Sequence, residues 1–81
     1  MKNKVVAGDF QYWDVVCRGN KLYFMHRLTK QEICKSDIAR FETVNGGRKS
    51  FLVSLEFVDG RRSLLEVDMA VYKGIFCALG F

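Results

Sequence analysis

An Asp-Gly pair at positions 59 and 60 separates two segments that contain apolar runs, residues 51–58 and 61–67. Such a pair is a strong hairpin signal, because a type I′ turn needs a positive φ angle at both central residues. A two-residue turn pairs Val58 with Arg61, which sets Leu55 opposite Leu64. We therefore predict an antiparallel hairpin over residues 51–67, with apolar side chains on both faces. One of these faces carries Phe51, Val53, Leu55 and Phe57.

A second hairpin is predicted around Gly19-Asn20, a pair that suits a type II′ turn. This register pairs Arg18 with Lys21 and sets Trp13 opposite His26. The face expected in the core carries Trp13, Val15, Cys17, Leu22 and Phe24. The other face is only half apolar, and we expect something to cover part of it. It carries Tyr12, Asp14, Val16, Tyr23 and Met25.

Residues 28–41 fit two interpretations. Thr29 and Glu32 have the spacing of a capping box, which would begin a helix that presents Ile33, Cys34, Ile38 and Phe41 on one side. The alternative is a short strand over residues 32–34, a turn at Ser36-Asp37 and a second strand over residues 38–44. We prefer the strands, because Phe41, Thr43 and Val44 favour extended structure. Residues 45–50 then form a loop.

The end of the chain has the clearest helix pattern, over residues 69–79. Asp68 can cap its start, and Gly80 suits the left-handed position after its last turn. Phe81 could then fold back onto Phe76. Gly74 weakens the helix, so packing against a sheet must stabilise it. The predicted apolar stripe consists of Met69, Tyr72, Ile75, Phe76 and Leu79.

The 81 residues are enough for a single domain, residues 1–81, and a hydrophobic fraction of 49% is enough to give it a folded core. The predicted class is α+β: an antiparallel β meander or small open barrel closed by one C-terminal helix.

This pattern resembles a small bacterial pleckstrin-homology-like (PH-like) domain over roughly the C-terminal half of the chain. The resemblance rests on Lys35-Ser36-Asp37-Ile38, residues 51–58, the Asp59-Gly60 turn and the helix over residues 69–79. It implies a recognition platform. The chain is short for that fold, so the barrel is expected to be open or to be completed by a second copy.

Side chains that could support catalysis are few and scattered. Cys17, Cys34 and Cys77 lie far apart, and His26 is the only histidine. A tetrahedral zinc site needs four suitably spaced ligands, so we predict no metal site and no cofactor. Asp14 points to the face opposite His26, and no cysteine is well placed to pair with it. We therefore predict no catalytic residue, no small-molecule substrate and no enzymatic activity.

An odd number of cysteines argues against a secreted disulfide framework. No segment approaches the roughly 20 apolar residues that span a bilayer. The apolar run near the first residue is only three residues long, which is too short for a signal peptide. We therefore expect a cytoplasmic protein without a membrane span.

A net charge of +4, from 13 Lys and Arg against 9 Asp and Glu, is mildly basic. The half-apolar second face favours a protein partner or a homo-oligomer, and nucleic-acid binding through basic turns and exposed tyrosines is the alternative. Two basic pairs, Arg48-Lys49 and Arg61-Arg62, flank opposite ends of the predicted strand over residues 51–58. At about 3.3 Å per residue they lie about 26 Å apart. The candidate partner-binding residues are Tyr12, Tyr23, Met25, Arg48, Lys49, Arg61 and Arg62.

Overall fold

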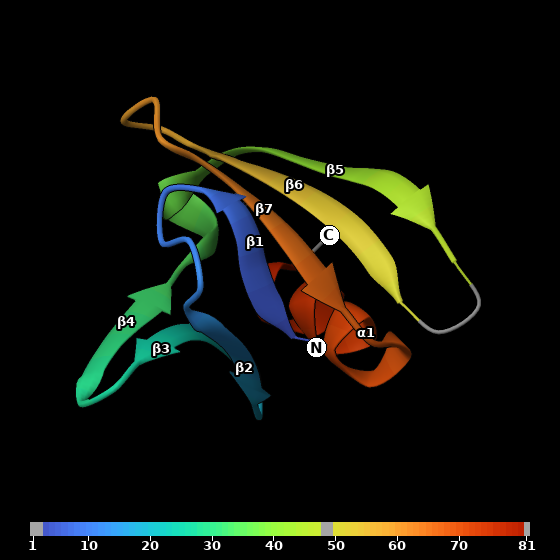
Figure 1. The fold of residues 1–81 in the computed structure, drawn as a ribbon, viewed down its shortest axis with the longest axis horizontal. Helices are drawn as coiled ribbons and strands as arrows, with labels where there is room; N and C mark the ends of the chain where they lie inside the picture. The colour runs from blue at the N-terminus through green and yellow to red at the C-terminus, as the bar shows by residue number, and fades with distance from the viewer. Residues whose placement is uncertain (1–2, 48–49, 81) are drawn as a thin grey trace.

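Residues 3–47 and 50–80, which the computed structural model describes, form seven antiparallel strands and one α-helix (Figure 1). A short 3₁₀ turn, η1 (Lys35–Asp37), joins the fourth strand to the fifth, and α1 (Met69–Leu79) follows the last strand. The strand order across the sheet is β4-β3-β2-β1-β7-β6-β5. The predicted antiparallel sheet with a C-terminal helix is therefore confirmed. The strands are β1 (Lys4–Gly8), β2 (Asp14–Arg18), β3 (Lys21–His26), β4 (Thr29–Ile33), β5 (Ile38–Gly46), β6 (Phe51–Phe57) and β7 (Arg62–Val67).

The sheet curls so that its two halves enclose the core, and α1 packs into the concave side (Figure 1). The described strands leave β4 and β5 as the two ends of the sheet, each with a single hydrogen-bonded neighbour. The barrel is therefore open, as the length of the chain suggested. The buried apolar side chains are Val5, Val15, Leu22, Phe24, Ile33, Val53, Leu55, Phe57, Leu65, Val67, Ile75 and Leu79.

Strand β1, which was not predicted from the sequence, joins the two halves of the sheet. It pairs with β7 along most of its length and with β2 at Lys4 and Asp14. The register shifts between Val5 and Ala7, so the strand bends as it passes from one half to the other. Val5 is fully buried at this junction.

The Gly19-Asn20 hairpin has the predicted register, with Arg18 opposite Lys21. Gly19 has a φ of 58°, as the first central residue of a type II′ turn requires.

The register predicted for the Asp59-Gly60 hairpin is wrong by one residue. Leu55 lies opposite Ser63 rather than Leu64. The N–H of Phe57 donates to the carbonyl of Arg61 at 2.8 Å, so the loop holds three residues and Gly60 takes a φ of 95°. A one-residue slip moves every side chain of one strand to the other face. Leu64 therefore points away from the core, and the outer face of this hairpin alternates leucine with serine and charged residues.

Residues 28–41 contain two strands and no α-helix, so the strand interpretation is confirmed and the helix is wrong. The first strand spans Thr29–Ile33 rather than residues 32–34, and the predicted Ser36-Asp37 turn belongs to η1. Thr29 pairs with His26 across a two-residue turn, so it belongs to a ladder and cannot cap a helix. Arg27 takes a φ of 55° in that turn. Strand β5 continues to Gly46, so the predicted loop is shorter than expected. Its residues 48 and 49 lie outside the described part.

Helix α1 has the predicted ends. The carboxylate of Asp68 accepts from the N–H of Val71 at 2.9 Å, and Gly80 has a φ of 72°. Ile75 and Leu79 are buried, whereas Met69 is 48% exposed, so Met69 does not belong to the packed stripe. The proposed contact of Phe81 lies outside the described residues. Among those residues, no helix is long and apolar enough to cross a bilayer.

Candidate binding site on the outer sheet face

Strands β2, β3 and β4 turn a second set of side chains away from the core. Cross-strand pairs place Asp14, Met25 and Lys30 in one row of this surface. The next row holds Val16, Tyr23 and Glu32. Because α1 packs on the concave side, no described element covers this surface, which we call the outer face. Its apolar members, Val16, Tyr23 and Met25, are half-buried only by their neighbours on the sheet.

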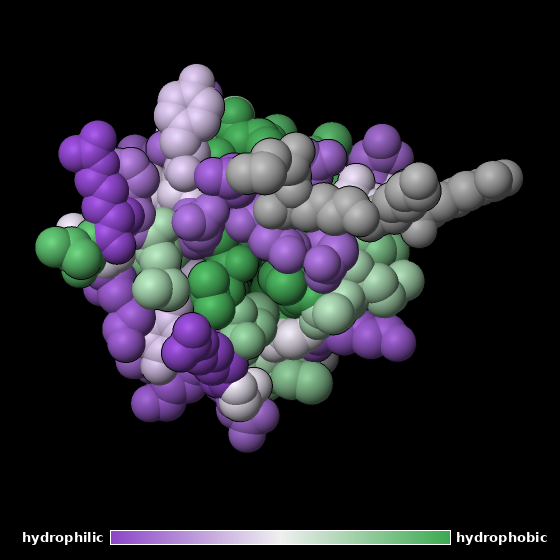
Figure 2. All heavy atoms as spheres, turned by 60° about the horizontal axis from the view of Figure 1, so that its bottom comes forward, coloured by the Kyte–Doolittle hydropathy of each residue, from purple (hydrophilic) through white to green (hydrophobic). Residues whose placement is uncertain are grey.

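A hollow of about 230 Å³ lies on the outer face, lined by Arg18, Tyr23, Met25 and Lys30. The ammonium of Lys30 sits 4.8 Å from the centre of the Tyr23 ring, within the range of a cation–π interaction. Seen with the lower side of Figure 1 brought forward, apolar side chains gather at the centre of the surface and hydrophilic ones surround them (Figure 2).

The acidic residues of the outer face already have partners. The carboxylate of Asp14 lies 3.1 Å from the ammonium of Lys4. The Glu32 carboxylate accepts from the Cys34 thiol at 3.7 Å. Arg18 and Lys30 form no ion pair within residues 3–47 and 50–80. The hollow therefore combines two available cations with an aromatic ring and a thioether, a set suited to an anionic group next to an apolar one.

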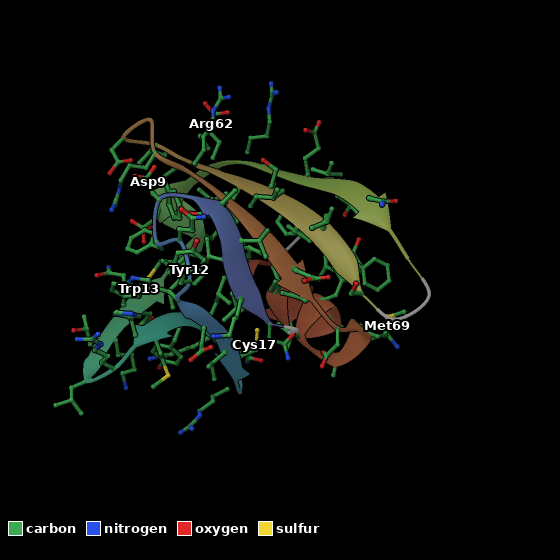
Figure 3. The ribbon with its side chains drawn as sticks, in the orientation of Figure 1. Asp9, Tyr12, Trp13, Cys17, Arg62 and Met69 are labelled. Atoms are coloured by element: carbon green, nitrogen blue, oxygen red, sulfur yellow. The ribbon has the colours of Figure 1, made fainter. Side chains whose placement is uncertain are left out.

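Tyr12, predicted to share a face with Tyr23, lies elsewhere. It is 70% exposed in the connection between β1 and β2, beside Trp13 (Figure 3). Its φ of 74° and the bond from its N–H to the Val5 carbonyl at 2.8 Å show that it belongs to a turn. Tyr23 and Met25 do lie together on the outer face.

Arg61 is already engaged at the tip of the β6–β7 hairpin. Its Nε lies 2.7 Å from the Asp59 carboxylate, and its guanidinium stacks over the rings of Phe10 and Phe57. The backbone N–H of Arg61, helped by its side chain, lowers the pKa of Asp59. Arg61 thus covers one end of the core.

Arg62 is also engaged. Its guanidinium lies 3.6 Å from the Glu56 carboxylate, and its backbone N–H donates to the carboxylate of Asp9 at 3.0 Å. Figure 3 shows Asp9 and Arg62 near each other at this end of the sheet. Of the two predicted basic pairs, one therefore ties neighbouring turns together, and the other, Arg48 and Lys49, lies outside the described residues.

Sequence reasoning did not select Arg18 and Lys30 for the hollow. Arg18 follows Val16 by two positions and therefore lies on the same face of the predicted hairpin, so its place on this surface could have been predicted. Lys30 could not, because its direction depends on the β3–β4 register, which the sequence left open.

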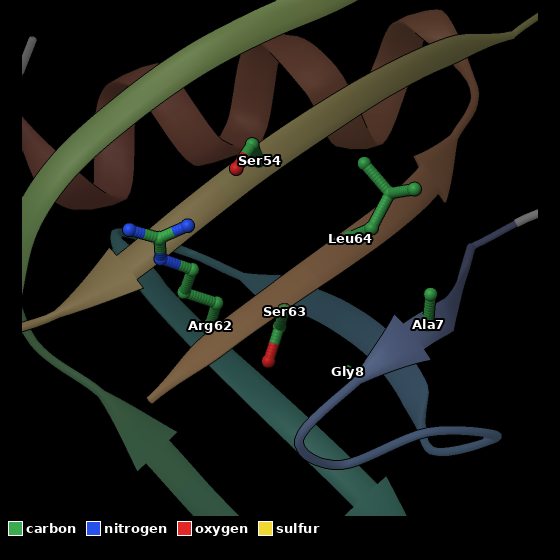
Figure 4. Close-up of a pocket in the computed structure, with 6 residues that line it drawn as sticks. All are labelled: Ala7, Gly8, Ser54, Arg62, Ser63 and Leu64. Atoms are coloured by element: carbon green, nitrogen blue, oxygen red, sulfur yellow. The ribbon is translucent and has the colours of Figure 1, made fainter. Parts of the chain in front are cut away.

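A second hollow, of about 160 Å³, lies on the outer side of β1, β6 and β7 (Figure 4). It is lined by Ala7, Gly8, Ser54, Arg62, Ser63 and Leu64. Its one cation, Arg62, already faces Glu56, and the hydroxyl of Ser63 donates to the Asp9 carbonyl at 2.7 Å. This hollow therefore offers fewer groups to a ligand than the first.

His26 packs against a neighbouring ring, and the pKa values of two cysteine thiols, Cys17 and Cys34, are raised. The ring of His26 stacks on Trp13 with centroids 5.5 Å apart, as their opposed positions predicted. Burial, with a smaller contribution from Cys77, raises the pKa of the Cys17 thiol to about 11. Partial desolvation, followed by the nearby carboxylates of Glu32 and Asp37, raises the pKa of Cys34, which is exposed. Both thiols are therefore poor nucleophiles near neutral pH.

In the part of the chain that the structure describes, no group of three or more histidine, cysteine or acidic side chains could hold a metal ion. The fold and the surface together define a small α+β domain with a cationic, partly aromatic hollow on an open sheet face. No family model and no curated protein matches this sequence.

Proposed function

We propose that this protein is a non-enzymatic binding module that takes a protein partner on the outer face of β2, β3 and β4. The observation that carries the proposal is the hollow lined by Arg18, Lys30, Tyr23 and Met25. Tyrosine, methionine and arginine are enriched where proteins meet. An open sheet with one C-terminal helix also supports the resemblance to a small PH-like domain, which is a recognition platform.

The partner that fits best is an acidic segment that carries an apolar or aromatic side chain. A carboxylate would lie between Arg18 and Lys30, whose charges are not matched by the acidic residues of this face. The apolar side chain would pack on Tyr23 and Met25. Charge complementarity of this kind selects partners and speeds association more than it adds affinity.

Nucleic acid is the alternative occupant, because an aromatic ring flanked by cations is also a platform for a base. One feature favours the acidic peptide: Tyr12 does not lie beside Tyr23 to stack a second base. Steep salt dependence would mark nucleic-acid binding.

Selection from a displayed library of random peptides tests the proposal. We expect enrichment of acidic peptides with one aromatic or aliphatic anchor. Lys30→Glu should weaken binding of a selected peptide about tenfold, whereas Lys73→Glu, the same charge change on exposed helix surface, should leave it within about twofold. Enriched peptides without acidic residues, or equal binding by both variants, would refute the site. Salt-sensitive binding of single-stranded oligonucleotides, in the absence of any peptide, would assign the hollow to nucleic acid.

A further inference from the structure

The two ends of the sheet differ in what they offer to another strand. An edge strand presents alternate backbone N–H and C=O groups away from its single neighbour, and proteins usually protect such edges. β4 is five residues long and polar, with a lysine at its second position. β5 is nine residues long and carries neither lysine nor proline. No described element flanks β5 on the side away from β6 (Figure 1).

The helix holds the middle of β5 in place from the concave side. The ring of Phe41 packs against Phe76 with centroids 5.2 Å apart. The hydroxyl groups of Thr43 and Tyr72 lie 2.7 Å apart, within hydrogen-bond distance. Register shifts occur on both sides of this segment, so residues 40–43 form a short regular stretch between two irregularities. The stretch is therefore an ordered edge of limited length.

Arg40 and Glu42 lie on the opposite side of β5 from Phe41. Arg40 faces Glu56 and Glu42 faces Ser54 across the β5–β6 ladder, and all four belong to the outer side of the sheet. Both side chains are exposed, and neither forms an ion pair within the described residues. A positive and a negative side chain thus flank Phe41 symmetrically on one face of an open strand.

We propose that β5 pairs antiparallel with β5 of a second copy of this chain, with Phe41 of both copies at the twofold axis. A twofold interface is self-complementary, so residue i of one copy meets residue j of the other and the reverse. In this register Arg40 lies opposite Glu42 of the partner subunit, and this pair occurs twice. The surface is distinct from the hollow on β2, β3 and β4, so the inference does not rest on the proposed function.

The charges select this register over its neighbours. If the concave sides of both copies are to lie on the same side of the joined sheet, the axis must pass through a single residue of β5. An axis through Arg40 would set arginine opposite arginine, and an axis through Glu42 would set glutamate opposite glutamate. Like charges directly opposite each other destabilise a ladder, whereas opposite charges stabilise it. The axis through Phe41 is therefore the favoured one.

The same pairing would end at a dimer. The irregularities that flank residues 40–43 keep the new ladder short. The edges left free are the two copies of β4, which are short and carry Lys30. The expected species is a reversible dimer and not a growing sheet.

Sedimentation equilibrium between about 10 µM and about 1 mM tests the inference, and the wild-type chain should show a monomer–dimer equilibrium in this range. Glu42→Arg should raise the dissociation constant about tenfold or more, because arginine then faces arginine at two places. Arg40→Glu should do the same. The double variant, with the two charges exchanged, should return to within about threefold of wild type.

An equimolar mixture of the two single variants provides the sharpest control. Each variant repels itself, but every carboxylate of one then faces an arginine of the other, so the mixture should form a heterodimer. Arg40→Glu also faces Glu56 within its own chain, so circular dichroism must show that it folds; Glu42→Arg faces only Ser54 and keeps the test available. A wild-type chain that stays monomeric throughout, or single variants that dimerise as well as wild type, would overturn the proposal.

Discussion

Gly74 lies in the middle of α1, where glycine is about 1 kcal/mol less favourable than alanine. Propensity alone would make Gly74→Ala stabilising. The structure predicts the opposite, because a Cβ at this position would lie 2.9 Å from Cβ and 3.1 Å from Sγ of Cys17 on β2. The nearer atom is bonded directly to the strand backbone, so it cannot move aside as a long side chain could. Either the helix or the strand has to shift.

Two opposed effects determine how much Gly74→Ala changes the free energy of unfolding. Overpacking a well-filled contact costs about 1–3 kcal/mol. Subtracting a gain in helix propensity of about 1 kcal/mol leaves a net loss of about 0–2 kcal/mol. A loss of 1 kcal/mol lowers Tm by about 4–8 °C in a domain of this size. Urea denaturation and thermal unfolding of Gly74→Ala would measure both quantities.

Two variants separate the contact from the propensity. Ala70→Gly, at an exposed position of the same helix, should lose about 0.5–1 kcal/mol and calibrate the propensity of α1. In a chain that already carries Cys17→Gly, both close atoms are gone, and Gly74→Ala should then stabilise by about 1 kcal/mol. If Gly74→Ala stabilises the otherwise wild-type chain by that amount, the close approach of α1 to β2 is refuted.

Asp68→Ala should lower the free energy of unfolding by about 1 kcal/mol in urea denaturation, because the start of α1 loses its cap; no loss would contradict the capping bond. The Asp59 carboxyl should titrate by NMR below its ordinary pKa of 3.8, and Arg61→Ala should raise that value only in part, because the backbone N–H remains. Since folding lowers this pKa, the stabilising effect is complete above 3.8 and is lost as pH falls through the folded-state value. Near neutral pH a thiol reagent should modify exposed Cys77 well before Cys17, whose pKa is about 11, and equal rates in the folded protein would show that Cys17 is not shielded.

The elements that could be predicted are those whose signals are local. Asp68 and Gly80 mark the two ends of α1 through hydrogen bonds and a φ angle that involve only neighbouring residues. Gly19-Asn20 fixes its hairpin for the same reason, because a two-residue turn leaves one register.

The elements that could not be predicted depend on contacts between distant residues. Asp-Gly also suits a three-residue loop with a left-handed glycine. In addition, Ser63 is polar but buried, so the apolar residues of β7 did not indicate which of its faces lies in the core. The Arg27-Leu28 turn contains no residue type that signals a turn. Arg27 takes a positive φ there because the pairing of β3 with β4 requires it. The hollow on the outer face could not be predicted in full either, because Lys30 reaches Tyr23 only in the observed β3–β4 register.

Strand β1 has a further consequence for how the chain acquires its structure. It hydrogen-bonds to its neighbour in sequence, β2, and also to β7, whose residues follow it by about sixty positions; Lys4, for example, lies opposite Glu66. A chain leaving the ribosome can close the β2–β3–β4 meander early, but β1 must wait for β7 before the two halves are joined. Closing so long a loop before its contacts form slows folding, to milliseconds or longer for topologies dominated by distant pairings. Completion of the sheet is therefore a late step in folding, and until then the apolar side of the first meander is exposed and prone to aggregation.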